Sequence, residues 1–227
     1  MLGTIVNTAC ILLGTAIGAT LRSRLDKRLQ QSLYNALGLV TLALGANMCV
    51  SNMARSQVPV LFIASLCVGS LTGMWLDIDR RIDSLAARHN ASRLAQGLTT
   101  ACLLYRIGTL SIMGPVLSAV HGDNTYLFTN ATLDLVSSAV FAATYGWGMA
   151  LGAVVLFCWQ GSIWLMARLL NDAGAIPDAL MAEVSLVGGV LLLSSGLAIL
   201  DIKDCKTVNM LPALLVPVVY FLMFHQG

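Results

Sequence analysis

Charge is the scarcest property of this chain of 227 residues, because Asp, Glu, Lys and Arg together make up only 11% of it. That share is less than half of the roughly 25% found in ordinary soluble domains. Hydrophobic residues, by contrast, make up 57%, and a water-soluble globule of this size could not hide so much apolar surface. The composition therefore excludes a soluble enzyme, a disordered chain and a nucleic-acid-binding protein, and it indicates a polytopic membrane protein.

The chain also lacks the motifs of metal sites, disulfide frameworks and enzymes. Its six cysteines include no CxxC pair, and its three histidines lie far apart in the sequence. No P-loop, HExxH or GxSxG sequence is present. We therefore expect no catalytic residue, no metal site, no cofactor and no enzymatic activity. We expect the cysteines to act as small buried apolar side chains.

Eight apolar segments approach or reach the length of about 20 helical residues that crosses a bilayer. They cover residues 3–21, 33–50, 58–76, 98–119, 132–146, 148–169, 181–200 and 207–224. The fifth segment is short and begins beside Asp134, so it is either a full tilted span or a half-membrane helix. The connections are too short for a soluble domain, and we expect residues 1–227 to form one all-α bundle in the lipid bilayer.

The basic residues favour eight full crossings, because positive charge collects on the cytoplasmic side of membrane proteins. With eight crossings, the loops after the first, third and seventh segments share one side, and both termini lie on the other. The polar stretch 77–97 is then a cytoplasmic connector, either solvated at the lipid headgroups or regulatory. Those three loops hold ten of the thirteen basic residues, namely Arg22, Arg24, Lys27, Arg28, Arg80, Arg81, Arg88, Arg93, Lys203 and Lys206.

Two glycine-containing stretches suggest an internal repeat. Residues 38–45 and 189–196 each hold two glycines seven positions apart, and a proline opens the next segment in each case, Pro59 or Pro212. Segments 1–3 then correspond to segments 6–8, five crossings apart, which makes the copies inverted, as in many secondary transporters. A chance likeness between apolar runs is the alternative. The repeat divides the domain into repeat one (1–76), the connector (77–97), a central helix pair (98–147) and repeat two (148–227).

The central pair contains the most unusual residues. Arg106 interrupts the fourth segment at a depth of roughly 12 Å, where a guanidinium needs a partner, a water-filled cavity or an anion. A snorkelling arginine that reaches the headgroups is the alternative. Gly108, Gly114 and Pro115 predict a broken helix whose free backbone groups, together with the Ser111 hydroxyl, bind ions or carboxylates. A simple proline kink would explain the same residues.

A carboxylate and two hydroxyls share one face of the fifth segment, because Asp134, Ser137 and Ser138 are spaced i, i+3 and i+4. This combination suits the handling of a proton or a cation. The alternative is that Asp134 only caps the helix and interacts with its dipole, since an acid near a helix start is favourable.

Isolated amides and small residues mark further contacts between helices. Asn7, Gln160 and Asn209 lie within or at the ends of apolar segments, and Asn7 and Gln160 take similar places in the two predicted copies. Amides in lipid need partners, so a hydrogen bond between helices is one interpretation and a ligand contact is the other. Three small-xxx-small pairs allow close helix packing, either within one chain or between the copies of a homo-oligomer: Gly14/Gly18, Gly69/Gly73 and Gly148/Gly152.

Short motifs spread along the chain form a recognisable set. They are Gly3–Asn7 with Gly14 and Gly18, Leu133–Ala142 with Gly146 and Gly148, Gln160-Gly161, Gly188-Gly189, Gly196-Leu197 and Asn209–Ala213. These motifs resemble those of the YqgA-like bacterial membrane proteins, the family called domain of unknown function 554. The resemblance covers nearly the whole chain and implies a transporter-like protein of the bacterial inner membrane with no assigned activity. The chain departs from the family at Tyr105-Arg106, Asn130-Ala131 and Leu135, where the family has small residues, a lysine–serine pair and a glycine-like position.

We therefore interpret the chain as a secondary transporter or channel for a small ion or metabolite. Arg106 would contact an anion or counter-charge, and Asp134 would couple a proton or cation. The expected partners are the lipid bilayer, a small ion or metabolite and a second copy of the chain, with no nucleic acid. A non-transporting scaffold or assembly protein is the alternative, which the small-residue pairs and the basic connector favour. The polar lining would come from Ser111, Ser137, Ser138, Asn7, Gln160 and Asn209.

Overall fold

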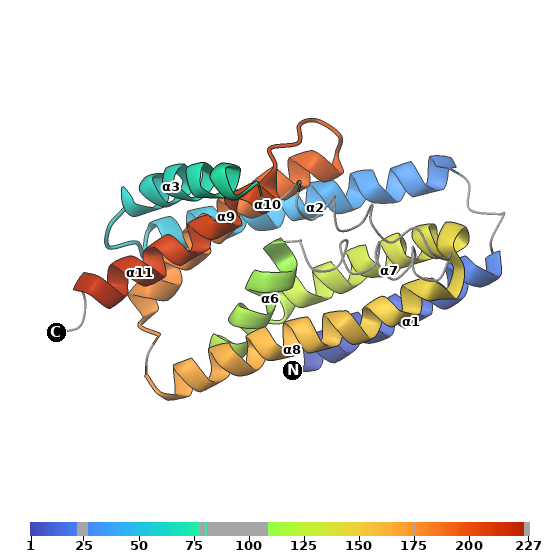
Figure 1. The fold of residues 1–227 in the computed structure, drawn as a ribbon, viewed down its shortest axis with the longest axis horizontal. Helices are drawn as coiled ribbons and strands as arrows, with labels where there is room; N and C mark the ends of the chain where they lie inside the picture. The colour runs from blue at the N-terminus through green and yellow to red at the C-terminus, as the bar shows by residue number, and fades with distance from the viewer. Residues whose placement is uncertain (22–26, 78–79, 81–108, 175, 225–227) are drawn as a thin grey trace. The chain divides into compact units, whose positions relative to one another are not determined.

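The computed structural model describes residues 1–21, 27–77, 80, 109–174 and 176–224, and every regular element in this part of the chain is a helix (Figure 1). The chain divides into two compact units, each of which draws on both halves of the sequence. Unit 1 combines Met1–Leu37 with Ile82–Asn171, and unit 2 combines Gly38–Arg81 with Asp172–Gly227. The predicted all-α class is confirmed, and each of the eight predicted segments contains a helix.

Apolar helices long enough to cross a membrane dominate the described residues. Two further apolar helices, α3 (Leu61–Leu76) and α6 (Thr109–Val120), are shorter. Large apolar side chains on these helices are exposed, as Trp75 (85%) and Val50 (73%) illustrate. Such faces are stable against lipid or another apolar surface. The five stretches that are long and apolar enough to span are Leu2–Thr20, Asn35–Met53, Gly146–Asp172, Asp178–Ile199 and Thr207–Phe224.

Unit 1 is assembled on a close pair of parallel helices, α1 and α7. They run in the same direction, because successive α1 glycines, from Gly3 to Gly18, contact successively later residues of α7. The elements of this unit are α1 (Leu2–Leu21), α6, α7 (Thr125–Tyr145), the short 3₁₀ helix η1 (Gly146–Met149) and α8 (Ala150–Asp172).

Two glycines allow α1 to approach α7 so closely. A Cβ on Gly14 would lie 2.9 Å from the Cβ of Ser138, and a Cβ on Gly18 would lie 2.9 Å from the Cα of Ala139. Both added atoms would also meet backbone carbonyl oxygens of α7, which cannot move aside as a side chain can. The Gly14/Gly18 pair is therefore used for packing within one chain.

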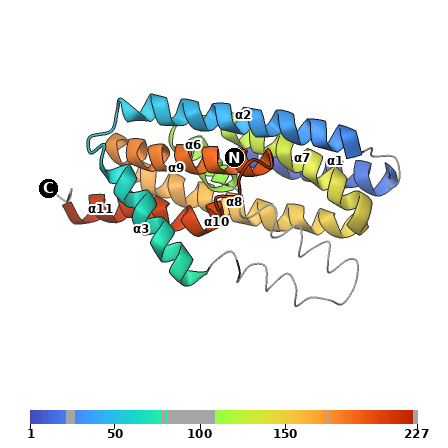
Figure 2. The ribbon, with the colours of Figure 1, turned by 90° about the horizontal axis from the view of Figure 1, so that it is seen from above.

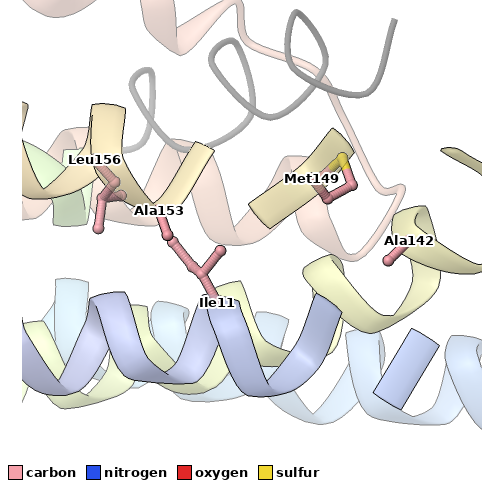
Figure 3. Packing of buried hydrophobic residues seen from close by; sticks show 5 residues of the cluster. All are labelled: Ile11, Ala142, Met149, Ala153 and Leu156. Atoms are coloured by element: carbon pink, nitrogen blue, oxygen red, sulfur yellow. The ribbon is translucent and has the colours of Figure 1, made fainter. Parts of the chain in front are cut away.

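An apolar cluster joins α8 to the same pair of helices. Ile11 meets the first turns of α8, whereas Met1 lies near Gly161 further along it, so α8 runs antiparallel to α1 (Figure 1). All the cluster residues are at most 1% exposed, and they close one side of the α1–α7 contact. Figure 3 shows these residues, which are Ile11 from α1, Ala142 from α7, Met149 from η1, and Ala153 and Leu156 from α8.

A tight turn connects α6 to α7 and fixes where α7 begins. Gly122 has a φ of 71°, a left-handed conformation that glycine adopts without steric cost. The Asp123 carboxylate accepts the backbone N–H of Thr125 over 2.9 Å, which satisfies a free donor at the start of α7. The Ser118 hydroxyl of α6 donates to the side-chain oxygen of Asn124 over 2.8 Å and ties the two helices together.

Unit 2 contains an antiparallel contact between α2 and α9, where the two glycine stretches meet (Figure 2). A Cβ on Gly45 would lie 2.9 Å from the carbonyl oxygen of Gly189. Gly38, one end of the contact on α2, lies against Leu200 at the far end of α9. The elements of this unit are α2 (Lys27–Met53) from Gly38 onwards, α3, α9 (Asp178–Ile199), α10 (Thr207–Met210), the 3₁₀ helix η2 (Leu211–Leu214) and α11 (Leu215–Phe224).

The last helical stretch packs on α3 through a second glycine pair. Gly69 lies against Ala213 of η2, and Gly73 lies against the backbone of Asn209 in α10. Neither position has room for a Cβ, and the two contacts show that α3 and the α10–η2 stretch run antiparallel. The Gly69/Gly73 pair is thus also used within the chain.

The central pair differs from the sequence prediction in two respects. The sequence predicts a short segment over 132–146, whereas α7 is a continuous helix of 21 residues from Thr125 to Tyr145. Its first turns are polar, but the hydroxyls of Thr129 and Thr132 donate to carbonyl oxygens four residues earlier, so the helix satisfies them itself. The predicted break at Gly114 and Pro115 is absent, because α6 continues through both residues; Gly108 lies outside the described residues.

The helix directions are those that an inverted repeat requires. The predicted counterparts α1 and α8 run antiparallel in unit 1, and α2 and α9 do so in unit 2, as do α3 and the α10–η2 stretch. The repeat stays a prediction, and the two compact units cut across the division into 1–76, 77–97, 98–147 and 148–227. Most of the 77–97 connector lies outside the described residues.

Candidate functional site

Asp134 lies in the middle of α7, about nine residues and roughly 13 Å along the helix from Thr125. Its side chain is only 6% exposed. A carboxylate caps a helix, or gains from its dipole, only within the first turn. The capping explanation of Asp134 is therefore wrong, and the capping contact belongs to Asp123.

Amide groups from two helices hold the Asp134 carboxylate. Asn130, one turn earlier on α7, donates from Nδ2 to Oδ2 of Asp134 over 2.9 Å and to the hydroxyl oxygen of Ser111 on α6 over 3.3 Å. Asn7 of α1 lies close enough to the Asp134 carboxyl group to interact with it. One turn later on α7, the Ser138 hydroxyl donates to the backbone carbonyl of Asp134. The carboxylate is thus fixed by neighbours on its own helix and on α1.

The hydrogen bonds continue from Asn7 to α8. Nδ2 of Asn7 donates to Oε1 of Gln160 over 3.3 Å, which is the helix–helix bond expected for amides in an apolar bundle. A connected set of polar side chains therefore crosses four helices of unit 1, and none of these side chains is more than 6% exposed. We refer to this set as the polar chain, and its members are Ser111, Asn130, Asp134, Asn7 and Gln160.

The glycines of α1 explain why Asn7 reaches Asp134. Gly3 and Gly14, on either side of Asn7, both lie against α7. The backbone of α1 is therefore close to α7 along the whole stretch, and a short amide side chain is long enough to reach the carboxylate. A larger residue at either glycine would push α1 outwards and lengthen the contacts of Asn7.

The polar chain holds one carboxylate and no basic side chain, and no ion pair involves Asp134 among the residues that the structure describes. A charged carboxylate in such apolar surroundings costs several kcal/mol of stability unless its charge is balanced. Amide donors offset only part of that cost. The arrangement is therefore suited to taking up and releasing a single positive charge, either a proton or a monovalent cation.

Three predicted site residues are not among the members of the polar chain named above. Arg106 lies outside the described residues, and its contact with an anion or counter-charge stays a prediction. Ser137 is buried on α7, one turn after Asp134. Asn209 belongs to unit 2, where its backbone lies against Gly73. The predicted residues that the structure does bring together are Asn7, Ser111, Asp134, Ser138 and Gln160.

Two polar residues escaped the sequence interpretation. Asn130 precedes Asp134 by four residues, and this i, i+4 spacing was the available signal. Glu183 is fully buried in α9 of unit 2, where its Oε1 accepts the Ser56 hydroxyl over 2.6 Å and the Val58 backbone N–H over 3.0 Å. An acid inside an apolar segment was the signal there, and the side chain fastens the loop between α2 and α3 to α9.

Comparison with known proteins assigns the chain to a family. The profile of the family described as "Protein of unknown function (DUF554)" matches residues 2–222. The chain belongs to the DUF554 family. The predicted resemblance is therefore confirmed, although this family carries no assigned activity.

Two relatives of this DUF554 protein cover nearly its whole length. The "Uncharacterized membrane protein YdfK" of Bacillus subtilis (strain 168) is 46% identical over 225 residues, covering 99% of this chain and 97% of the relative. The "Uncharacterized protein YqgA" of Escherichia coli (strain K12) is 29% identical over 227 residues, covering 95% and 94%. No solved structure matches the chain significantly. The similarity to the Bacillus subtilis membrane protein, together with the apolar helices, identifies the DUF554 protein as a membrane protein.

Proposed function

We propose that this DUF554 protein is a secondary transporter or channel that moves a small ion or metabolite across the bacterial inner membrane. The polar chain carries the proposal, because it joins a buried carboxylate at the middle of α7 to polar side chains of α1, α6 and α8. Polar groups inside a membrane bundle cost stability, and in membrane proteins they mark the paths of ions, protons and substrates.

In the proposed mechanism, Asp134 alternates between a state with a bound positive charge and a state without one. Asn130 follows this change, because an amide presents its N–H to a bare carboxylate and its oxygen to a proton donor or a cation. The polar chain is closed in the described state, so each cycle must open unit 1 to one side of the membrane at a time. The antiparallel counterpart helices support such alternating access.

The orientation of the protein belongs to the same proposal. The ten basic residues of the three loops face the cytoplasm, and both termini face the periplasm. This arrangement requires α7 to cross the membrane fully, and its 21 residues are long enough to do so.

A flux measurement tests the proposal. The full-length protein is reconstituted into liposomes, and currents are recorded on a solid-supported membrane after concentration jumps of sodium, potassium, protons, chloride, amino acids and organic acids. We expect a response to at least one of these solutes and its loss in Asp134→Asn, because asparagine keeps the shape of aspartate without its charge. Asp201→Asn is the matched control, since Asp201 is exposed and asparagine tolerates its left-handed φ of 55°.

Two outcomes would count against the proposal. If no solute produces a response above that of protein-free liposomes, the protein does not transport anything in the panel. If Asp134→Asn responds as strongly as the wild type, the polar chain is not part of the transport path.

A non-transporting scaffold is the second candidate, and the burial of the polar chain favours it. Buried hydrogen bonds of this kind also hold helices together without any ligand. A scaffold would lose stability in Asp134→Asn, Asn7→Ala and Gln160→Ala but would show no solute-dependent response in liposomes.

A further inference from the structure

Three buried side-chain oxygen atoms of α1 have no hydrogen-bond partner among the described residues, namely those of Thr4, Asn7 and Thr15. Oδ1 of Asn7 and Oγ1 of Thr4 lie within one helical turn of each other, and both side chains are fully buried. The two residues are three positions apart, so they share one face of α1. A buried acceptor without a donor is unfavourable and requires an explanation, and a bound ion is one of the few available.

The position of Asn7 restricts what could satisfy its oxygen. Its nitrogen already donates to Gln160, and the same side chain interacts with the carboxyl group of Asp134. The unpaired oxygen is therefore held next to the carboxylate. A species that satisfied both groups at once would carry positive charge and accept oxygen ligands only.

The charge of the described residues favours a monovalent species. Among them, the polar chain contains a single carboxylate, and its other members are neutral amides and a hydroxyl. A divalent cation would leave an unbalanced positive charge in apolar surroundings, which is strongly unfavourable. Carboxylate, amide and hydroxyl oxygens are the ligands that hard cations prefer.

The packing around the site limits the size of the ion. Gly14 holds the backbone of α1 against α7 within two turns of Asn7, so that a single added Cβ would lie 2.9 Å from Ser138. A large cation with many ligands, such as potassium, would have to separate these helices. A small one needs only the few oxygens that α1 and α7 present.

We infer that unit 1 binds one sodium ion between the Asp134 carboxylate and the amide oxygen of Asn7, with the Thr4 hydroxyl as a further ligand on the same face of α1. This site deepens the proposed function, because it names the ion that Asp134 couples. Sodium balances the charge of Asp134 and satisfies the unpaired oxygen of Asn7 without any change in the bond from Asn7 to Gln160.

Equilibrium binding tests the inference without any need for transport. The full-length protein in detergent is unfolded by heat while tryptophan fluorescence is recorded, with sodium chloride exchanged for choline chloride at constant total chloride. We expect a saturable rise in Tm of at least about 3 °C with sodium, since a ligand that binds only the folded state stabilises it. Lithium should act similarly, and potassium should have no effect beyond that of choline.

Three variants place the effect at the site. Asp134→Asn should abolish the sodium-dependent rise, and Asn7→Ala should increase the half-saturating sodium concentration at least about tenfold, because one ligand is lost. Glu183→Gln is the matched control, since it also neutralises a fully buried carboxylate but lies in unit 2; its sodium response should equal that of the wild type. Binding of radioactive sodium to the same proteins gives a second readout for any variant whose folding is impaired.

The possible results separate the inference from the proposed function. Equal Tm values in sodium and choline, or an unchanged sodium response in Asp134→Asn, overturn the sodium site. A Tm that depends on pH in sodium-free buffer but not on sodium would assign a proton to Asp134, with Cys10 of α1 as its titratable neighbour in the described residues. Sodium binding without any flux in liposomes would leave the site standing and reject the transporter.

Discussion

Replacing Gly18 by alanine measures how strongly unit 1 depends on the contact between α1 and α7. The new Cβ would lie 2.9 Å from the Cα of Ala139 and against its carbonyl oxygen, whereas ordinary contacts begin at 3.4 Å. Both opposing atoms belong to the backbone, so the two helices must move apart. Overpacking of this kind costs about 1–3 kcal/mol, and the better helix propensity of alanine returns up to about 1 kcal/mol. We expect a net loss of about 1–2 kcal/mol.

Gly161 offers the matched comparison on α8. Its nearest neighbour for an added Cβ is the terminal methyl carbon of Met1 at 3.8 Å, which is an ordinary contact. Gly161→Ala should therefore be neutral or should stabilise the protein by up to about 1 kcal/mol through helix propensity alone. Both variants add the same atom to a membrane helix, so their difference reports packing rather than chemistry.

Thermal unfolding followed by tryptophan fluorescence, with size-exclusion chromatography and light scattering alongside, distinguishes the outcomes. Gly18→Ala should lower Tm by about 2–8 °C relative to the wild type, and Gly161→Ala should not lower it. Equal Tm values for the two variants would refute the close packing of α1 on α7. A change of oligomeric state in Gly18→Ala at unchanged stability would instead mean that this glycine face contacts a second copy of the chain.

Two further predictions concern unit 2 and the orientation in the membrane. Glu183→Leu should destabilise the protein by about 2–5 kcal/mol, because Ser56 and Val58 lose their hydrogen-bond acceptor. Glu183→Gln should be less destabilising, because its side chain keeps an oxygen for both donors. Unfolding of the two variants in denaturing detergent checks this prediction, and equal stability would contradict it. A fusion of alkaline phosphatase to the C-terminus should be active and a fusion of green fluorescent protein should be dark, and the reverse pattern would place the C-terminus in the cytoplasm.

The sequence predicted the helical class and the approximate places of the helices, because both depend on local composition. A run of apolar residues in lipid must form a helix to satisfy its own backbone, whatever its neighbours are. The pairing of Asn7 with Gln160 was also accessible, since isolated amides in apolar helices need each other.

The depth of Asp134 was harder to predict. The turns before it contain Thr129 and Asn130, which lower the hydropathy and move the apparent start of the helix by seven residues from Thr125 to Thr132. The hydroxyls bond back to the helix, and the amide bonds to Asp134, so that none of them stops the helix. A hydropathy value depends on which residues are polar, and it takes no account of whether their polar atoms form hydrogen bonds within the helix.

The sequence could not predict which helices belong to which of the two units. Sequence similarity pairs segments as copies, but packing decides which of them share a core. Here α1 shares its unit with α6, α7 and α8, while α3 shares its unit with α9, α10 and α11. Such choices depend on contacts between residues more than a hundred positions apart, which a single sequence does not display.

The contacts of the α3 glycines can form only late in the synthesis of the protein. Gly69 and Gly73 are covered by Ala213 and Asn209, which the ribosome makes about 140 residues later, after roughly 7–30 s at ordinary rates of elongation. During that interval α3 is already made, but the surface that covers its closest contacts does not yet exist. The insertion machinery must keep this face from pairing with other helices, and a chain cut short before α10 would present the face indefinitely to chaperones and proteases.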